Sequence, residues 1–339
     1  MAELTVGAGF AGGLLAFAAW KGADRLVLAE RAGIDPAALL DHDNRIPFAR
    51  YVALMREAKA MTGDPALALH FAEAVNISEV SIVGLIGQAS ESMIDAFHQL
   101  NRYVRLVVET ENDGAGTRFQ LVRDHTGAWL VDARRRPNDF PELTESAFAQ
   151  LVCGPRRHGK EAIVRAVHFT HADPGYRDEY ERIFGAPVVF GSDWNALAID
   201  NDWTTDKVRV LPRYAFDVLT QRAEALLEDL ESSKGVRGRV EALLVPVLHT
   251  GEANMDRVAR QMGMSRQTLF RKLKAEGVTF EKVLDELRHK LSLSYMSAEK
   301  KVSVNEAAYL VGFSDPAAFS RAFKRWTGSS PRNLRSQAA

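Results

Sequence analysis

The sequence predicts two domains of different class. An α+β N-terminal domain, with helices and a small mixed sheet, precedes an all-α domain in which a long helix joins two helix-turn-helix units. Three observations support this prediction: a length of 339 residues, strand-like alternation confined to residues 117–200, and an internal repeat after residue 255. We expect an N-terminal domain at 1–205, a helical linker at 206–235 and a C-terminal domain at 236–339.

The composition is that of an ordinary globular protein, with 46% hydrophobic and 26% charged residues. It argues against disordered, collagen-like and disulfide-stapled chains. One cysteine, Cys153, cannot form an internal disulfide, which favours a reducing compartment. The longest apolar stretch, residues 7–20, is shorter than the ~18 residues of a membrane span and follows no basic segment. We therefore expect a cytoplasmic protein with no membrane contact.

The first hundred residues show helical periodicity. Apolar residues recur at helical spacing in residues 48–61 and 93–108. Between these stretches, Asp64-Pro65 supplies a cap residue followed by a proline, which is typical of a helix start.

A strand pattern follows the helices. Residues 117–123 and 128–134 alternate between apolar and polar, and residues 124–127 form a hairpin signal between them. The remaining elements are predicted as strands at 163–170 and 196–200 and as helices at 140–152 and 175–184. Together they predict the sheet of the N-terminal domain.

A long helical pattern covers residues 206–231 and is broken at residues 232–235. Its apolar side carries Leu219, Ala223, Leu226, Leu227 and Leu230. This side either packs on its own domain or forms the seam of a homodimer.

The net charge of −1 conceals an asymmetry along the chain. Residues 256–335 contain 16 Lys and Arg against 8 Asp and Glu, whereas the rest of the chain has a net charge of −9. A basic C-terminal block on an acidic body predicts that only the block meets a polyanion.

The C-terminal block contains the repeat. Residues 258–265 are echoed by residues 307–314, and after the turn Leu269, Arg271, Leu273 and Lys274 correspond to Phe319, Arg321, Phe323 and Lys324. Each copy has the order helix, glycine-containing turn, helix, which is typical of a helix-turn-helix unit. Gly263 and Gly312 can adopt the positive φ that ends a helix. Ser265 is expected to cap the second helix of the first unit, and Ser314 or Asp315 that of the second.

Two recognition helices are thus expected at about residues 265–276 and 315–326. The helix predicted at 280–296 would be about 25 Å long. A rod of this size can hold the recognition helices about one DNA turn apart, roughly 34 Å. The side chains expected to point outward are Arg266, Gln267, Thr268 and Arg271, and in the second helix Ala317, Ser320, Arg321 and Lys324.

Residues 265–277 and 311–331, with Arg332 and Arg335, resemble the two halves of the AraC/XylS-type DNA-binding domain. The N-terminal half is similar to the arabinose-binding-type domain of such regulators, through residues 32–36, 45–47, 62–65 and 184–190. This resemblance implies a transcription regulator, usually an activator, that binds promoter DNA, a small-molecule effector and RNA polymerase. Pro316 and Ala317 depart from the pattern, because relatives often carry hydrogen-bonding side chains there.

The chemistry of the outward side chains suggests their roles in successive major grooves. Arg271 can donate two hydrogen bonds to guanine, and Gln267 can pair with adenine. Phosphate contacts are expected from Arg266, Thr268, Lys274, Lys324 and Arg325.

The effector is expected to meet the N-terminal domain. Its strands and helices offer apolar and cationic side chains that suit a carboxylate with an apolar tail, namely Phe119, Trp129, Arg134, Phe148 and Phe169. We expect no cofactor and no metal. Apart from one arginine that could neutralise a ligand carboxylate, we expect Arg134-Arg135-Arg136 to be solvated. We also expect Cys153 to be a buried inert thiol, and His168 and His171 to lie on opposite faces of a strand.

Parts of the sequence are also compatible with two other functions. Residues 7–12 fit G-x-G-x-x-G after a short apolar segment, as in a flavin- or nicotinamide-dependent oxidoreductase. However, no series of alternating strands and helices follows, and residues 24–31 have the signals of a capped helix. The third possibility is a constitutive DNA-binding protein whose N-terminal domain serves only dimerisation.

Overall fold

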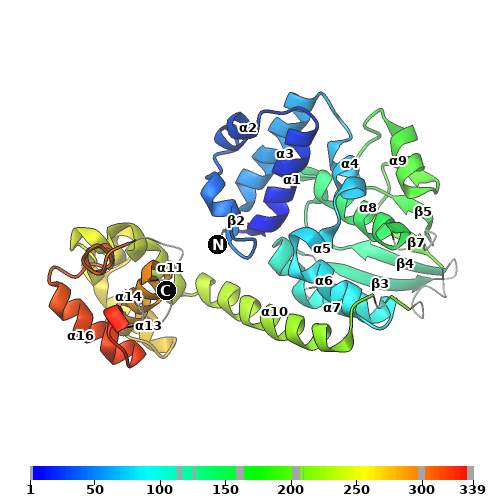
Figure 1. The fold of residues 1–339 in the computed structure, drawn as a ribbon. Helices are drawn as coiled ribbons and strands as arrows, with labels where there is room; N and C mark the ends of the chain where they lie inside the picture. The colour runs from blue at the N-terminus through cyan, green and yellow to red at the C-terminus, as the bar shows by residue number, and fades with distance from the viewer. Residues whose placement is uncertain are drawn as a thin grey trace. The chain divides into compact units, whose positions relative to one another are not determined.

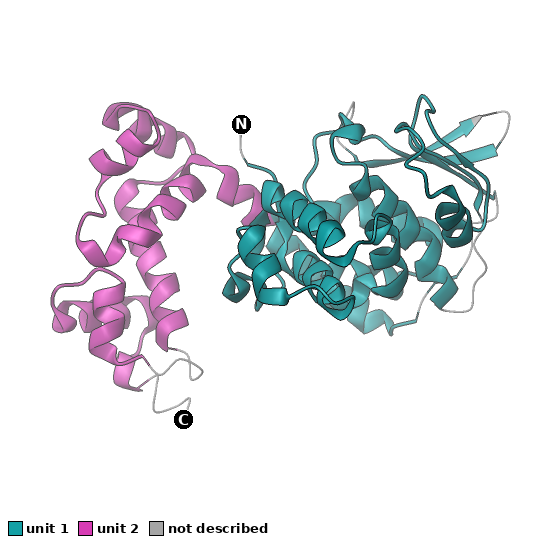
Figure 2. Ribbon diagram, turned by 90° about the horizontal axis from the view of Figure 1, so that it is seen from above, with its two compact units in different colours: residues 1–227 teal, residues 228–339 magenta. Residues whose placement is uncertain are grey.

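The computed structural model describes residues 3–112, 117–124, 127–157, 164–200, 207–208, 210–296 and 302–333. The chain forms two compact units, residues 1–227 and 228–339, coloured separately in Figure 2. Several predictions fall on residues outside the described ranges: the hairpin turn at His125 and Thr126, the strand start at Ile163, the boundary at 205/206, and Arg335.

The first unit begins with a helical layer. Its elements are β1 (Thr5–Gly7), α1 (Ala8–Trp20), α2 (Arg25–Arg31), η1 (Pro36–Leu39), β2 (Arg45–Pro47), α3 (Phe48–Thr62), α4 (Leu67–Ala74), α5 (Ile77–Val80), α6 (Ile82–Ala89) and α7 (Met93–Val107). Asp24 caps α2 by accepting from the backbone N–H groups of Leu26 and Val27, at 2.9 and 3.0 Å.

The G-x-G-x-x-G segment does not begin a parallel βαβ unit. Strand β1 pairs antiparallel with β2, with Val6 opposite Ile46. The stretch after α1 that could have supplied a second strand is helix α2. The glycines instead let α1 pack closely, because a Cβ on Gly9 would lie 2.3 Å from the carbonyl oxygen of Val80.

The sheet of the first unit is small and mixed (Figure 1). Its strands are β3 (Phe119–Asp124), β4 (Gly127–Asp132), β5 (Val164–His168), β6 (Val188–Val189) and β7 (Ala196–Ile199), in the order β3-β4-β7-β5-β6. All neighbours are antiparallel except β5 and β6. Strand β6 was not predicted, because two residues are too few to show alternation.

Helices α8 (Glu142–Arg157) and α9 (Arg177–Phe184) follow β4 and β5 respectively. The main core of this unit lies between the sheet and α4, α7, α8 and α9, with Phe148, Phe169 and Phe184 fully buried. Strand alternation places Trp129 on the other face of the sheet, in a small cluster with Trp194. Helix α10 (Arg213–Lys234) begins later than predicted, directly after Pro212.

In its described residues the second unit contains helices and no strands, and it begins with the last residues of α10. Its elements are α11 (Val236–Leu244), η4 (Val245–Thr250), α12 (Met255–Gln261), α13 (Arg266–Ala275), α14 (Phe280–Met296), α15 (Val304–Leu310) and α16 (Pro316–Thr327). Two apolar cores form, one around Leu269 and Leu273 and the other around Phe319 and Phe323. Leu291 of α14 packs against both cores, so the 17-residue α14 joins the two helix-turn-helix units as predicted. Among the helices described here, none has the length and apolar character needed to cross a membrane.

Candidate functional site

The turns of both helix-turn-helix units depend on glycine. Gly263 has φ 67° and Gly312 has φ 80°, in the left-handed region that favours glycine. At Gly312 space is also limiting, since a Cβ would lie 2.3 Å from the carbonyl oxygen of Leu248. After the turns, Ser265 caps α13 through the N–H of Thr268, and Asp315 rather than Ser314 caps α16.

Helices α13 and α16 each bury one side and expose the other. Leu269, Leu273, Phe319 and Phe323 are at most 1% exposed. Of the ten predicted DNA contacts, Thr268 and Ser320 are half-buried and the others are exposed, namely Arg266, Gln267, Arg271, Lys274, Ala317, Arg321, Lys324 and Arg325. The repeat thus presents two separate basic helix faces.

The exposed cations differ in how they are engaged. Arg266 pairs with Asp256 at 3.0 Å and Arg321 with Asp315 at 3.7 Å. In the described part of the chain, Arg271, Lys274 and Lys324 make no ion pair. These three side chains can therefore bind a phosphate or a base without first breaking an ion pair with a described carboxylate.

Two positioning residues were not predicted from the sequence. Arg288 of α14 donates to the carbonyl oxygens of Val311 and Gly312, at 3.0 and 3.3 Å, and so holds the second turn. Asp285 of α14 accepts from Arg325 at 2.7 Å. Their only sequence signal is a charged residue beside the apolar side of a long helix.

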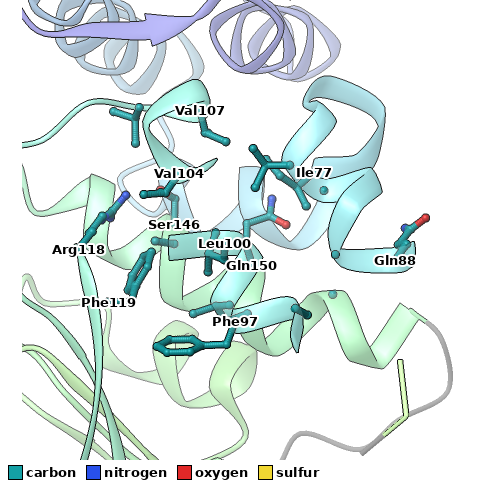
Figure 3. A pocket seen from close by; sticks show the side chains of 18 of the residues that line it. Ile77, Gln88, Phe97, Leu100, Val104, Val107, Arg118, Phe119, Ser146 and Gln150 are labelled. Atoms are coloured by element: carbon teal, nitrogen blue, oxygen red, sulfur yellow. The ribbon is translucent and has the colours of Figure 1, made fainter. Parts of the chain in front are cut away.

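A cavity of about 230 Å³ lies within the first unit (Figure 3). Side chains of α5, α6, α7, α8 and β3 line it, among them Ile77, Phe97, Leu100, Val104 and Phe119. The lining is mainly aliphatic and aromatic. Among the described lining residues none is acidic, and the one cation is Arg118.

Arg118 is part of a buried charge cluster. Its Nε and Nη2 donate to the two carboxylate oxygens of Asp132 at 3.2 and 3.0 Å. Arg134 and Thr144 contact the same carboxylate at 3.4 and 2.9 Å. Burial raises the pKa of Asp132, but the charges of Arg118 and Arg134, together with hydrogen bonds from Arg118 and Thr144, outweigh burial and hold its pKa below the ordinary value. Two guanidinium groups share one carboxylate, so the cluster carries an excess positive charge.

Gln150 contributes an unsatisfied acceptor to the cavity lining. Its Nε2 donates to the carbonyl oxygen of Val75 at 2.9 Å. Its Oε1 is buried and accepts no hydrogen bond from the described residues. A buried acceptor without a partner costs free energy, which a ligand carrying a donor can recover.

Of the five predicted effector contacts, only Phe119 lines this cavity. Trp129 lies on the opposite face of the sheet, and Phe148 and Phe169 are fully buried in the core. Arg134 donates to the hydroxyl of Thr144 at 2.6 Å and is 7% exposed. The expectation that Arg134 is solvated is therefore wrong, because Asp132, Thr144 and two carbonyl oxygens satisfy it inside the unit.

A second buried acid lies on α8. The hydroxyl of Tyr180 donates to Glu145 Oε1 at 2.7 Å, and His171 Nε2 lies 3.3 Å from the same oxygen. Burial raises the pKa of Glu145 to about 7 and lowers that of His171. His168 contacts Trp129 and Ser192 instead, so the two histidines diverge. Cys153 is buried, and the described residues contain no cluster of His, Cys, Asp and Glu suited to a metal.

The chain is similar to known proteins along almost its whole length. The chain is 28% identical over 336 residues to the ornithine utilization regulator of Pseudomonas aeruginosa, covering 96% of this chain and 95% of that protein. It is 24% identical over 324 residues to the HTH-type transcriptional regulator VirS of Mycobacterium tuberculosis, covering 93% and 91%. The crystal structure of the transcriptional regulator CdpR from Pseudomonas aeruginosa aligns over 92% of this chain and 96% of that chain, with 19% identity and a TM-score of 0.40.

Two protein families match successive parts of the chain. Residues 258–337 match a helix-turn-helix domain. Residues 22–208, more than half of the chain, match the arabinose-binding N-terminal domain of AraC transcription regulators. The chain is therefore a DNA-binding transcription regulator rather than an enzyme, and it belongs to the AraC family.

Proposed function

We propose that the protein is a cytoplasmic regulator whose sequence-specific binding to promoter DNA is controlled by a small-molecule effector. Helices α13 and α16 enter successive major grooves, and the bound protein contacts RNA polymerase and activates transcription. The observation that carries the DNA-binding part is the pair of exposed helix faces on which Arg271, Lys274 and Lys324 have no ion-pair partner among the described residues.

The outward side chains divide by chemistry. Arg271 pairs with guanine and Gln267 with adenine, while Arg266, Thr268, Lys274 and Lys324 hold phosphates. Ala317, Ser320 and Arg321 complete the second face. Arg325 makes the weakest contribution, because Asp285 competes for its guanidinium group.

We place the effector in the cavity of the first unit. The apolar lining suits a compact hydrophobic body, and the excess positive charge at Arg118 suits a carboxylate. Ornithine, which appears in the name of a relative, does not suit this lining. Its ammonium groups would lose water without meeting an acidic residue among the described lining residues.

Thermal unfolding with added ligands tests this placement. Octanoate and phenylacetate represent apolar carboxylates, and ornithine and arabinose serve as the contrasting ligands. A bound ligand at a hundred times its Kd stabilises the folded state by about 2.7 kcal/mol. Stabilisation by ornithine or arabinose alone would contradict the proposed chemistry. Gln150→Leu should leave the binding of octanoate and phenylacetate unchanged, because neither carboxylate carries a donor for the Gln150 oxygen.

Effector control itself requires a second measurement. A ligand that stabilises the protein should change its DNA affinity, because it binds one arrangement of the chain better than another. If a saturating ligand leaves the DNA affinity unchanged, the protein is a constitutive DNA-binding regulator.

The proposal also includes homodimerisation through the apolar side of α10. On α10, Ala223 is fully buried within one chain, and Leu219, Leu226 and Leu227 are half-buried. The exposed apolar side chains of α10 include Tyr214 and Val218, at 79% and 48%. Sedimentation at two protein concentrations distinguishes a dimer from a monomer.

A further inference from the structure

We propose that Phe270 of α13 contacts the 5-methyl group of thymine in the major groove and so makes the first recognition helix selective for thymine. This inference rests on the proposed entry of α13 into the groove. It adds an apolar base contact to a helix face whose other predicted contacts are hydrogen bonds and charges.

The first observation is the exposure of Phe270. Its side chain is 50% exposed, although the neighbouring Leu269 and Leu273 are buried. It is not among the side chains that pack against the core of the first helix-turn-helix unit, and it makes no ring contact among the described residues. An exposed phenyl ring gains free energy when a partner removes it from water.

The second observation is the set of charges around the ring. Phe270 directly precedes Arg271 and lies one helical turn from Arg266 and Lys274. An apolar ring bordered by cations complements a surface that is polyanionic and also offers apolar groups. The major groove of DNA provides both, because thymine carries a methyl group there and phosphates line the groove.

The third observation is the internal repeat. The offset of 50 residues that relates Arg271 to Arg321 also relates Phe270 to Ser320. Ser320 is one of the predicted DNA contacts in α16, so Phe270 has the equivalent place in α13. The two units differ in chemistry at this position, since a hydroxyl group can pair with several bases whereas a phenyl ring favours only the methyl group.

A thymine-to-deoxyuridine scan tests the proposal. The full-length protein first selects its site from randomised duplexes, and each thymine of that site is then replaced by deoxyuridine, which lacks only the 5-methyl group. For the unsubstituted protein, we expect deoxyuridine at one or two positions to lower the DNA affinity about fourfold. This is the effect expected for the loss of one buried methyl-sized group. Those positions should lie beside the base pair at which Arg271→Ala relaxes the preference.

The variant Phe270→Ala should remove this sensitivity. It should bind the thymine site more weakly, and it should bind the thymine and deoxyuridine sites equally. Ser320→Ala serves as the matched control, and it should leave the deoxyuridine pattern at the α13 half-site unchanged. Because Phe270 is exposed, the thermal stability of the variant should match that of the unsubstituted protein; Phe270→Gln provides a second variant.

The outcomes separate two kinds of failure. If Arg271→Ala changes base preference but Phe270→Ala leaves the deoxyuridine pattern intact, the thymine contact is wrong and α13 still enters the groove. The same conclusion holds if Phe270→Ala impairs only protein–protein association. If neither Arg271→Ala nor Lys274→Ala alters DNA binding, the proposed entry of α13 fails, and the inference fails with it.

Discussion

Arg325 of α16 donates from one guanidinium nitrogen to both carboxylate oxygens of Asp285 on α14, at 2.7 and 3.0 Å. The indole N–H of Trp326 donates to the same carboxylate at 2.9 Å. The carboxylate of Asp285 therefore fixes the second recognition helix to α14, the helix that joins the two helix-turn-helix units. Arg325 thus has a structural role that its place on a basic face does not predict.

Asp285→Ala should loosen this attachment. The Arg325 and Asp285 side chains are 63% and 43% exposed, so solvent screens their charges. We expect the variant to lose about 1 kcal/mol of unfolding free energy, including the lost hydrogen bond from Trp326. Denaturant unfolding of both single variants and of the Asp285→Ala/Arg325→Ala double variant measures the coupling. Strictly additive losses would show that the pair does not interact.

Lys324→Ala should weaken binding to every DNA sequence alike. Lys324 is exposed and has no ion-pair partner in the described part of the chain, so it suits a phosphate contact. Removing one phosphate contact should lower the slope of log K against log salt by about 1. Arg325→Ala is the matched comparison, and its smaller effect should follow from the competing Asp285. Equal slopes for Lys324→Ala and the unsubstituted protein would exclude the phosphate contact.

Arg271→Ala should affect specificity instead. We expect a loss of ~1–3 kcal/mol on the selected site and a relaxed preference at one base pair, because a bidentate contact to guanine is removed. Lys272→Ala provides the control, because Lys272 is an exposed cation on the same helix that is turned by about 100° from Arg271 around the helix axis. Binding of random and selected duplexes by fluorescence anisotropy makes the comparison. Equal losses on both duplexes would make Arg271 a phosphate contact.

The helix-turn-helix units could be predicted from the sequence because their determinants are local. Gly263 and Gly312 end helices through their own φ angles, and the pairs Leu269/Leu273 and Phe319/Phe323 are each one helical turn apart. Such local determinants can be recognised within a short segment of sequence, and the repeat contains each of them twice.

The cavity and the buried charges could not be predicted in this way. Arg118 and Asp132 meet only because β3 and β4 pair, and Arg134 is satisfied by Thr144 of α8. Three of the predicted effector contacts, Trp129, Phe148 and Phe169, are large aromatic residues that fill the core or the far face of the sheet. Residue type suggests an apolar lining, but only the packing of α5, α6, α7, α8 and β3 decides which side chains border empty space.

Glu145→Gln should change how stability depends on pH. The unfolded chain ionises this carboxyl near its ordinary pKa of 4.5, whereas the folded protein holds the proton until about pH 7. Because the folded state binds the extra proton in this window, the contribution of Glu145 to unfolding free energy is present below pH 4.5. It is then lost as the pH rises to about 7, with a slope of up to about 1.4 kcal/mol per pH unit.

The glutamine variant isolates this contribution. Its amide oxygen can still accept from Tyr180, and it does not ionise, so its unfolding free energy should lack the decline and exceed that of the unsubstituted protein at pH 8. Glu181→Gln on α9, an exposed glutamate, is the control and should run parallel to the unsubstituted protein. Denaturant unfolding between pH 4 and 8 measures the difference in unfolding free energy between Glu145→Gln and the unsubstituted protein. The contributions of the other carboxyl groups cancel in this difference. A constant difference between Glu145→Gln and the unsubstituted protein across this range would show that Glu145 ionises equally in the folded and unfolded states.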